Sequence, residues 1–299
     1  MKLLFIVNPI SGGVNKEPFL KEAKLLCDKY GISYTVFKTT GKNDKEEALK
    51  VIDKIKPDKI ASVGGDGTTL FVATLLLGTD YPMGIIPLGS ANGMATELYV
   101  NLKPIEALKD IILSDIVGGL DMILINGEHY TLHIGDVGIN ASIVDSYEKD
   151  KNRGMITYAK YFLEEMTRLK HFNVTVEANG ESKKSMVLMT AICNARKYGT
   201  GVPLNIIGNP MDGLFEIVLI EKVDTSSLLA AGLAVLHEEF HDSQTSSVIQ
   251  TDKAVITFEE PRLLQLDGEV IQKYDRLDIE LLKGAVKFIT TTENLYYKN

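Results

Sequence analysis

Three glycines, an aspartate and two threonines gather at Gly64–Leu70, where an apolar strand-like run gives way to a helix-compatible one. Glycine lets the backbone approach a ligand closely, and the free amides at a helix N-terminus favour phosphate. This pattern indicates a phosphate-binding turn around Gly67 and Thr68. Asp66 fits such a turn if a Mg²⁺ ion or a polarised hydroxyl lies between its carboxylate and the phosphate.

Two more polar loops follow predicted strands. Asn8–Gly13 comes after the apolar run Leu3–Val7, and Pro87–Gly93 comes after Met83–Ile86. One such loop alone would be interpreted as a glycine-rich turn without a ligand. The carboxyl ends of parallel strands, however, lie at one edge of a sheet, and ligands collect there. Three loops at that edge predict a single phosphate site.

Two acidic turns in the second half of the chain could supply a base or a metal ligand. Asp267-Gly268-Glu269 lies between apolar runs, and Asp212-Gly213 follows Asn209-Pro210-Met211. An ordinary solvated hairpin turn is the alternative for each. Two carboxylates beside a glycine can instead accept a proton or bind Mg²⁺, and spacing alone leaves both interpretations open.

Other sequence matches are weaker. Gly84–Ser90 has P-loop spacing, but Ser90 stands where the lysine is required, and no G-x-G-x-x-G follows a predicted strand. His237–His241 matches the H-E-x-x-H zinc pattern, yet a third ligand in the required geometry is not evident. A polar helix end is the favoured interpretation of this segment.

The loops of the first half are separated by alternating strands and helices. Besides the strands above, the pattern predicts a helix at Pro18–Tyr30 closed by Gly31, a strand at Ile32–Phe37, a helix to Ile55 capped by Asn43 and Glu46, and helices at Met94–Leu98 and Pro104–Leu113. Alternation of this kind predicts an α/β fold with a doubly wound, Rossmann-like parallel sheet.

After about Gly119 the pattern becomes β-rich. Asn126-Gly127 and Asn179-Gly180 predict hairpin turns. Further strands are expected at Phe172–Ala178, Ser185–Cys193, Phe215–Ile220, Ala254–Phe258, Leu263–Leu266, Leu277–Leu282 and Val286–Thr290, with helices at Met155–Lys170 and Ser226–His241. We therefore expect a nucleotide-binding α/β domain over residues 1–122 and a β-rich, sandwich-like substrate domain over 123–299, with a cleft between them. About ten residues at the C-terminal end are expected to be able to return to the first domain.

Composition limits the classes of partner. The 299 residues carry a formal net charge of −8, which argues against a nucleic-acid partner bound along a basic face. Cys27 and Cys193 are isolated and outside any metal spacing, as expected for buried thiols. The longest apolar candidate, Leu228–Leu236, is too short to span a membrane. These features predict a cytoplasmic protein that contacts a membrane transiently from one side.

Together the loops and turns resemble those of the diacylglycerol kinase catalytic-domain family, which includes bacterial soluble lipid kinases and sphingosine-kinase relatives. The matching segments run in the family's order along nearly the whole chain: Asn8–Gly13, Gly64–Thr68, Pro87–Asn92, Gly154–Tyr158, Asp212–Leu214 and Asp267–Glu269.

The resemblance implies ATP, Mg²⁺ and phosphoryl transfer to a lipid hydroxyl, diacylglycerol-like or sphingosine-like, with a homodimer left open. It implies that the nucleotide is held by Asn8, Ser11, Gly12, Thr40, Gly64, Gly65, Asp66, Gly67, Thr68, Thr69, Leu70, Ser90 and Asn92. Asp212, with backbone carbonyls at Asn209 and Leu214, resembles a structural Mg²⁺ site. The implied catalytic residues are Asp66 and, as the base, Asp267 or Glu269, with Asp267 slightly favoured.

Two positions depart from the family. Phe71 stands where a glutamate is usual, three residues after Thr68, and Gly93 stands where an aspartate is usual. Loss of two acids near the phosphates points to altered metal handling, a different nucleotide or lost catalysis. An NAD-kinase-like enzyme is one alternative, because Gly64–Leu70 is close to the NAD-kinase motif. A catalytically silent regulator that binds lipid or nucleotide is the other.

Overall fold

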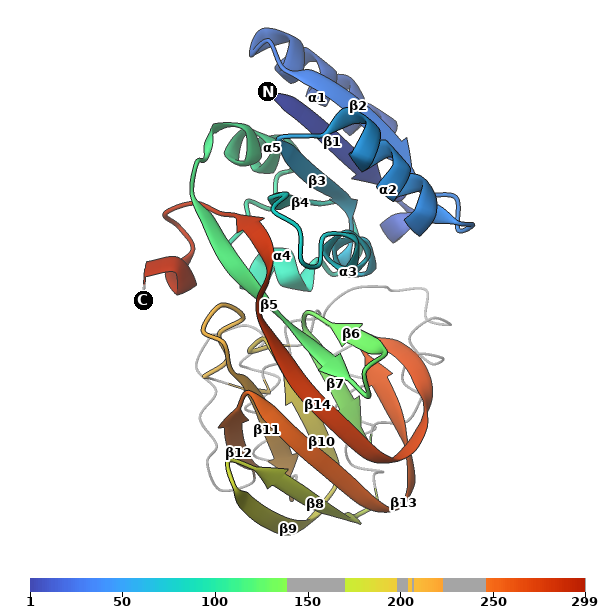
Figure 1. Cartoon of the computed structure of the whole chain (residues 1–299), viewed down its shortest axis with the longest axis vertical. Coiled ribbons are helices and arrows are strands. Elements are labelled where there is room, and N and C mark those ends of the chain that lie inside the picture. Colours follow the sequence, from blue (N-terminus) through green and yellow to red (C-terminus); the bar gives the residue numbers. More distant parts are fainter. Residues whose placement is uncertain (139–169, 198–203, 206, 223–245, 299) are drawn as a thin grey trace. The chain divides into compact units, whose positions relative to one another are not determined.

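The computed structural model describes residues 1–138, 170–197, 204–205, 207–222 and 246–298, which fall into two compact units (Figure 1). Unit 1 comprises Met1–Leu120 and Gly284–Asn299, and unit 2 comprises Asp121–Lys283. The two helices expected at Met155–Lys170 and Ser226–His241 lie outside the described residues, apart from Lys170 itself.

A parallel sheet with strand order β2-β1-β3-β4 forms the centre of unit 1 (Figure 1). The C-terminal end of β14 extends it, since Phe288 pairs in parallel with Met83 of β4. The elements of this unit are β1 (Lys2–Val7), a 3₁₀ turn (Ser11–Gly13), α1 (Glu17–Lys29), β2 (Ser33–Lys38), α2 (Asp44–Ile55), β3 (Lys59–Gly64), α3 (Asp66–Leu75), β4 (Met83–Pro87), α4 (Gly93–Glu97), α5 (Pro104–Leu113) and a C-terminal 3₁₀ turn (Leu295–Lys298).

Helices cover both faces of this sheet. Leu3 and Phe5 of β1 pack with Phe19 of α1 and Ile111 of α5 in one core cluster. The intervening β1 residues are equally buried and point to the other face, because strand side chains alternate. Helices α2 and α3 contact each other, and α2 contacts β1 and α3 contacts β3. Such burial on both faces is typical of parallel sheets, and it confirms the doubly wound α/β prediction.

Antiparallel strands make up unit 2. Its main strand order is β12-β11-β10-β7-β13-β14, with β8 and β9 attached to β13 and with β5 and β6 attached to β14 (Figure 1). The strands are β5 (Val117–Ile125, which begins in unit 1), β6 (His129–Thr131), β7 (Ile134–Val137), β8 (Phe172–Ala178), β9 (Glu181–Val187), β10 (Met189–Cys193), β11 (Phe215–Ile220), β12 (Ser246–Thr251), β13 (Lys253–Leu266) and β14 (Glu269–Ile289, which ends in unit 1).

One apolar core joins these strands. It includes Val174, Ile192, Phe215, Ile256 and Leu277, which come from different strands and are all nearly inaccessible to solvent. Strand β13 pairs first with β8 and then, after a break in register between Thr257 and Arg262, with β7. A strand that changes partners at a bulge is a usual corner of a sandwich-like fold. The β-rich prediction for the second half is confirmed.

The expected hairpin turns are present. Asn126-Gly127 and Asn179-Gly180 both have positive φ at each residue, and each connects two antiparallel strands. Asp267-Gly268 has the same conformation, with Leu266 paired to Glu269. Two-residue turns of this kind require left-handed backbone, which Asn, Asp and Gly tolerate best.

Three local predictions are wrong. The strand expected at Ser185–Cys193 is divided at Leu188 between β9 and β10. The runs expected at Ala254–Phe258 and Leu263–Leu266 form one strand, β13, and those expected at Leu277–Leu282 and Val286–Thr290 form one strand, β14. Pro261 interrupts the apolar pattern at the β13 bulge, and Gly284 interrupts it within β14, yet pairing with neighbours continues the strands. Asn43 makes no side-chain cap at α2 and has a left-handed backbone instead.

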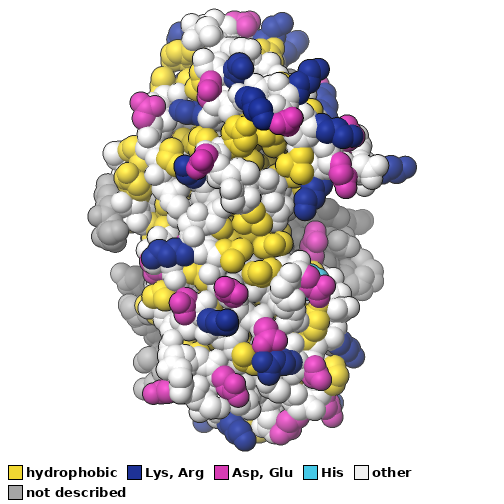
Figure 2. Space-filling view, in the orientation of Figure 1, with side chains coloured by type: hydrophobic (Ala, Val, Ile, Leu, Met, Phe, Trp, Pro, Cys, Tyr) yellow, Lys and Arg dark blue, Asp and Glu magenta, His cyan; other side chains and the backbone are white. Residues whose placement is uncertain are grey.

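Stability of each unit depends on its core rather than on surface charge. Basic and acidic side chains are interspersed over the visible surface of each unit (Figure 2). Pairs such as Lys38–Glu17 and Lys50–Glu47 are at least half exposed, and exposed pairs typically contribute only about 0–1 kcal/mol. Cys27 and Cys193 are free and buried, as expected, and burial raises the pKa of Cys27 to about 11.

Candidate active site

The turn from β3 into α3 is built for close backbone approach. A Cβ atom on Gly64 would lie 2.2 Å from Thr68 Oγ1, so only glycine fits at the end of this strand. Gly65 precedes the helix in an extended conformation and supplies no side-chain cap. The first amides of a helix have no intrahelical acceptor, so those of Gly67 and Thr68 at the start of α3 suit an anion.

Three loops cross at this point with their backbones in contact. A Cβ atom on Gly12 would lie 2.7 Å from the carbonyl carbon of Gly89, and one on Gly89 would lie 2.2 Å from Cα of Gly65. The Gly65 amide also donates to Ser11 Oγ at 2.9 Å. The loops after β1, β3 and β4 are therefore held together by glycine backbone and one serine hydroxyl, as parallel topology requires of strand ends at one edge.

The loop after β4 is held by its own asparagine. Asn92 has a φ of 54°, accepts the Gly89 amide at 2.8 Å and donates Nδ2 to the Gly89 carbonyl at 3.0 Å. Ser90 is exposed inside the loop that these bonds close. Sequence reasoning placed Asn92 at the nucleotide, whereas the structure shows what its side chain contacts: the backbone of its own loop.

Asp66 holds the start of α4. Its two carboxylate oxygens accept the amides of Gly93 and Met94, each at 2.9 Å. These are the first amides of α4, and a carboxylate there is favoured by the helix dipole. The sequence suggested a bare carboxylate that needs a Mg²⁺ ion or a polarised hydroxyl between it and the phosphate. In the structure the oxygens face backbone amides, and the carboxylate ties the second loop to the third.

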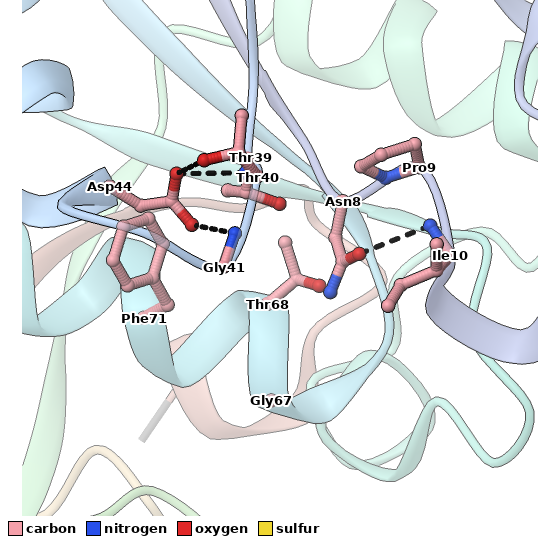
Figure 3. Close-up of a pocket in the computed structure, with 10 residues that line it drawn as sticks. All are labelled: Asn8, Pro9, Ile10, Thr39, Thr40, Gly41, Asp44, Gly67, Thr68 and Phe71. Carbon is pink, nitrogen blue, oxygen red and sulfur yellow. Dashed lines mark hydrogen bonds between the residues drawn. The ribbon is translucent and has the colours of Figure 1, made fainter.

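A cavity of about 420 Å³ opens beside these loops (Figure 3). It is lined by Asn8, Pro9, Ile10, Thr39, Thr40, Gly41, Asp44, Gly67, Thr68 and Phe71. Asn8, Thr40, Gly67 and Thr68 were candidates from sequence, and the cavity brings them together. The volume is within the range of about 300–1,000 Å³ usual for small-molecule sites.

Asp44 organises one wall of the cavity and was not a candidate from sequence. One of its oxygens accepts the Thr40 amide at 2.8 Å and the Thr40 hydroxyl at 3.1 Å, and the other accepts the Gly41 amide at 2.7 Å. Desolvation is the largest single influence and raises its pKa, but the three hydrogen bonds together outweigh it and leave the pKa lowered. The predicted helix start at position 44 was the only signal available for it.

Thr68 carries an unusual polar atom. Its side chain is almost completely buried, and Oγ1 has no hydrogen-bond partner among the described residues. Buried hydroxyls are normally paired, so an unpaired one beside a cavity leaves its hydrogen bond to a ligand or a water molecule. The buried Thr69 hydroxyl, by contrast, has a partner within the protein, since it donates to the Gly65 carbonyl at 3.2 Å. Leu70 does not line the cavity.

Lys16 supports the first loop, and sequence reasoning missed it. Its side chain is buried, and Nζ donates to the carbonyls of Ser11 and Val14. Burial lowers the pKa of this lysine. Because the lysine follows the loop in an otherwise polar stretch, no periodicity distinguishes it from an exposed one.

In unit 2 the turn at Asp267–Glu269 presents two different carboxylates. Asp267 accepts the buried Thr131 hydroxyl at 2.6 Å and the amides of Ile134 and Leu132 at 3.2 and 3.4 Å. Glu269, two residues later, is exposed. The aspartate is therefore fixed in place by β6 and the start of β7, while the glutamate extends from the turn into solvent.

The second acidic turn lies beside a buried polar cluster. Asp212 Oδ1 accepts the Leu214 amide at 2.9 Å, and burial raises the pKa of Asp212. Glu216, four residues on and fully buried, accepts Asn205 Nδ2 at 2.6 Å and Gln250 Nε2 at 2.9 Å. Desolvation raises the pKa of Glu216 to about 7 despite these bonds. Nothing in the sequence spacing marked Glu216.

Some candidates remain outside this description. Gly154–Tyr158 and His237–His241 lie outside the described residues, so their predicted roles stay predictions. Among the residues that the structure does describe, no three His, Cys, Asp or Glu side chains gather to hold a metal ion. The nucleotide candidates lie in unit 1, and Asp212, Asp267 and Glu269 lie in unit 2.

Comparison with known proteins agrees with the two units. Residues 2–123 match the model of the diacylglycerol kinase catalytic domain, and residues 135–290 match that of the YegS C-terminal NAD kinase beta sandwich-like domain. The second match alone covers more than half of the chain. The chain belongs to the diacylglycerol kinase and YegS-like family of lipid kinases. The resemblance noted from the loops is thereby confirmed, and the protein is a kinase, which implies ATP use.

Individual relatives of this kinase are distant but nearly co-extensive with it. Diacylglycerol kinase of Bacillus subtilis (strain 168) is 23% identical over 270 residues, with 88% of each chain covered. Lipid kinase YegS of Escherichia coli (strain K12) is 27% identical over 278 residues, with 90% of each covered. A crystal structure of a diacylglycerol kinase from Bacillus anthracis str. Sterne matches with a TM-score of 0.74 at 21% identity over 98% of each chain. That likeness supports the fold.

None of the helices that the structure describes is long and apolar enough to cross a membrane.

Proposed function

We propose that this kinase transfers the γ-phosphoryl group of ATP, with Mg²⁺, to the hydroxyl of a lipid of the diacylglycerol or sphingosine type. The cavity beside the α3 N-terminus carries the proposal, because it combines free helix amides, backbone-packed glycine loops and an unpaired buried hydroxyl at Thr68. Phosphoryl transfer needs positioning and charge stabilisation more than covalent chemistry. The names of the relatives support a lipid acceptor.

On unit 1, the phosphates are assigned to the amides of Gly67 and Thr68 and to the loops at Ser11–Gly12 and Ser90. Backbone amides at a helix N-terminus stabilise phosphate without side-chain reorganisation. Gly64 and Gly65 allow this approach, while Asp66, Thr69 and Asn92 hold the loops in place through the bonds described above. Thr40 and Asn8 line the remainder of the cavity.

The turn at Asp212 fits a Mg²⁺ ion in its donor chemistry. A carboxylate and the carbonyls of Asn209 and Leu214 are the oxygen ligands that Mg²⁺ accepts, with water completing the shell. Burial raises the pKa of Asp212, so a nearby cation would favour its ionised form. Lys283 already brings one positive charge, since its Nζ donates to the Asp212 carbonyl at 3.3 Å. When bound, the metal would supply charge that rigidifies this turn.

The proton of the attacking hydroxyl is assigned to Asp267 or Glu269. Asp267 has a fixed orientation, which favours it as a positioned base, while its lone pairs are shared with three donors. Glu269 is exposed and carries no such restraint. General-base assistance is typically worth about 10²–10⁴-fold in rate.

Two alternatives follow from particular residues. NAD-kinase-like activity is favoured by the likeness of Gly64–Leu70 to that family's motif and by the beta sandwich-like match of unit 2. A silent regulator is favoured by Phe71 and Gly93, which replace two usual acids. Gly93, however, has a defined place in the structure, because its amide donates to the Asp66 carboxylate and the residue itself is buried in α4.

The decisive experiment incubates the purified protein with γ-³²P-ATP and Mg²⁺ against a panel of lipid hydroxyls in mixed micelles, with NAD in parallel. Label transferred to a lipid supports the proposal, and label on NAD alone contradicts it. ATP binding without transfer to any acceptor indicates a regulator. The Asp267→Asn, Glu269→Gln double variant controls for a contaminating kinase.

Interactions beyond the substrate are proposed from composition. We propose a weak, reversible contact with membrane surfaces, through which lipid reaches the enzyme, and no nucleic-acid partner. Flotation with liposomes measures the first. A homodimer stays an open expectation, which sedimentation equilibrium would decide.

A further inference from the structure

Phe71 gives the cavity an aromatic wall. It lies on α3 one turn after Thr68, is half-buried, and lines the same cavity as Thr40 and Asp44. In Figure 3 its ring lies on the side of Asp44 and Gly41, whereas Asn8, Pro9 and Ile10 line the opposite side. The family usually has a carboxylate at this position, so the wall belongs to this chain rather than to the family pattern.

The cavity is therefore chemically divided along α3. At Gly67 and Thr68 the helix amides favour phosphate, while Phe71 offers a flat apolar surface four residues further on. Four residues of helix correspond to about 6 Å along the axis, which separates a phosphate site from a surface able to receive a base. Aromatic rings bind nucleobases by stacking, through a contribution that is similar for every base because each has a π-face.

The polar groups around this surface are already engaged. Asp44 accepts three hydrogen bonds from Thr40 and Gly41, and the Thr40 hydroxyl also contacts the Lys42 carbonyl at 3.2 Å. Among the described residues that line the cavity, Asp44 is the only acid. Because these groups already form hydrogen bonds within the loop, few side-chain groups remain to distinguish the hydrogen-bonding edge of adenine from that of guanine.

We propose that Phe71 stacks on the nucleobase of the donor, and that the site therefore binds adenine and guanine triphosphates with similar affinity. This inference rests on the proposed function, namely that the cavity binds a nucleoside triphosphate. It adds which part of the donor Phe71 contacts and which nucleoside triphosphates the enzyme accepts.

The first experiment measures binding of ATP, GTP and inorganic tripolyphosphate by calorimetry on the full chain with Mg²⁺. Wild-type affinities for ATP and GTP should agree within about fivefold, as expected for stacking without edge recognition. Phe71→Ala should weaken both nucleotides by about 5- to 150-fold, with tripolyphosphate unchanged. Phe71→Leu keeps an apolar side chain and should show the same loss, whereas Phe71→Tyr should retain binding. Leu25→Ala, exposed on α1, is the matched control.

The second experiment uses the absence of tryptophan from the sequence. Phe71→Trp places a single indole at the wall, and ATP or GTP should quench its fluorescence while tripolyphosphate should not. Tyr30→Trp, at the exposed end of α1, should respond to neither.

Three results would overturn the inference. Unchanged ATP affinity in Phe71→Ala would refute stacking while leaving the proposed nucleotide site intact. A preference for ATP over GTP greater than about 100-fold would refute the broad specificity, since stacking alone cannot produce it. If wild-type protein binds neither nucleotide nor tripolyphosphate, the proposed function fails together with the inference.

Discussion

The glycine loops of unit 1 and the acidic turns of unit 2 fix their functional groups in opposite ways. In unit 1, Gly12, Gly65 and Gly89 pack backbone against backbone, so geometry is set where no side chain fits. In unit 2, Asp267 is held by the Thr131 hydroxyl and by amides of the neighbouring strands. A backbone-built site is rigid and insensitive to pH, whereas a carboxylate held by hydrogen bonds can exchange a proton.

That contrast assigns different tasks to the two units. Phosphate binding benefits from preorganised amides that need not move during the reaction. Proton transfer needs a group whose charge changes, and both carboxylates proposed as the base, Asp267 and Glu269, lie in unit 2. Four predictions test this division, taken from the largest expected effect to the smallest.

The largest effect is expected at the proposed base. Asp267→Asn and Glu269→Gln, made separately, should divide into one variant whose kcat falls by about 10²–10⁴-fold and one that is close to wild type. ATP affinity measured by calorimetry should stay unchanged in both, because the nucleotide candidates lie in unit 1. If both variants keep wild-type turnover, neither carboxylate is the base.

The second largest effect is expected where the loops after β3 and β4 pack backbone against backbone. Gly89→Ala puts a Cβ atom 2.2 Å from Gly65 Cα, and no flexible side chain is there to yield. We expect a loss of about 3 kcal/mol of unfolding free energy, at the upper end for overpacking, and loss of nucleotide binding. Gly78→Ala is the contrasting control: Gly78 has a positive φ of 69°, which Gly89 does not, and a Cβ on Gly78 meets open space. Gly78→Ala therefore reports the cost of backbone strain alone, and a Gly89→Ala variant that keeps wild-type stability would contradict the packing argument.

Asp66→Asn separates a positioning role from direct chemistry. The amide can accept one α4 amide but presents an NH₂ group to the other, and the charge-assisted bonds are lost. We expect unfolding free energy to fall by about 2–3 kcal/mol, together with kcat. Thermal unfolding and turnover are measured on the same preparation. Full stability with abolished turnover would instead assign Asp66 to the reacting groups.

The smallest effect is a pH dependence in unit 2. Because the folded pKa of Glu216 is raised to about 7 from an ordinary value of 4.5, the folded state binds its proton more tightly than the unfolded state. Stability from this group is therefore lost as pH rises through about 4.5 to 7, by about 2–3 kcal/mol between pH 5 and 8. Glu216→Gln keeps the neutral form's shape and should lack this loss when urea unfolding is compared at pH 5 and 8. Parallel pH profiles for the two proteins would contradict it.

The sequence by itself determined the features that depend on residues close together along the chain. Buried strands followed by glycine loops predicted the parallel sheet of unit 1, because apolar runs and alternation with helices are local patterns. Asn126-Gly127 and Asn179-Gly180 predicted their hairpins, since left-handed turns accept few other residues. The order of the motifs also gave the family, which the two domain matches confirm.

Tertiary structure decided what those groups touch. The partners of Asp66 are 27 and 28 residues away, and those of Asp267 are more than 130 residues away, so no local pattern contains them. Pro261 and Gly284 disfavour a strand locally. Strands β13 and β14 nevertheless continue through them, because neighbouring strands supply backbone hydrogen bonds. Phe71 was visible in the sequence only as a missing acid. Its position on the cavity wall follows from the packing of α3 beside the loops after β1 and β2, which brings together residues distant along the chain.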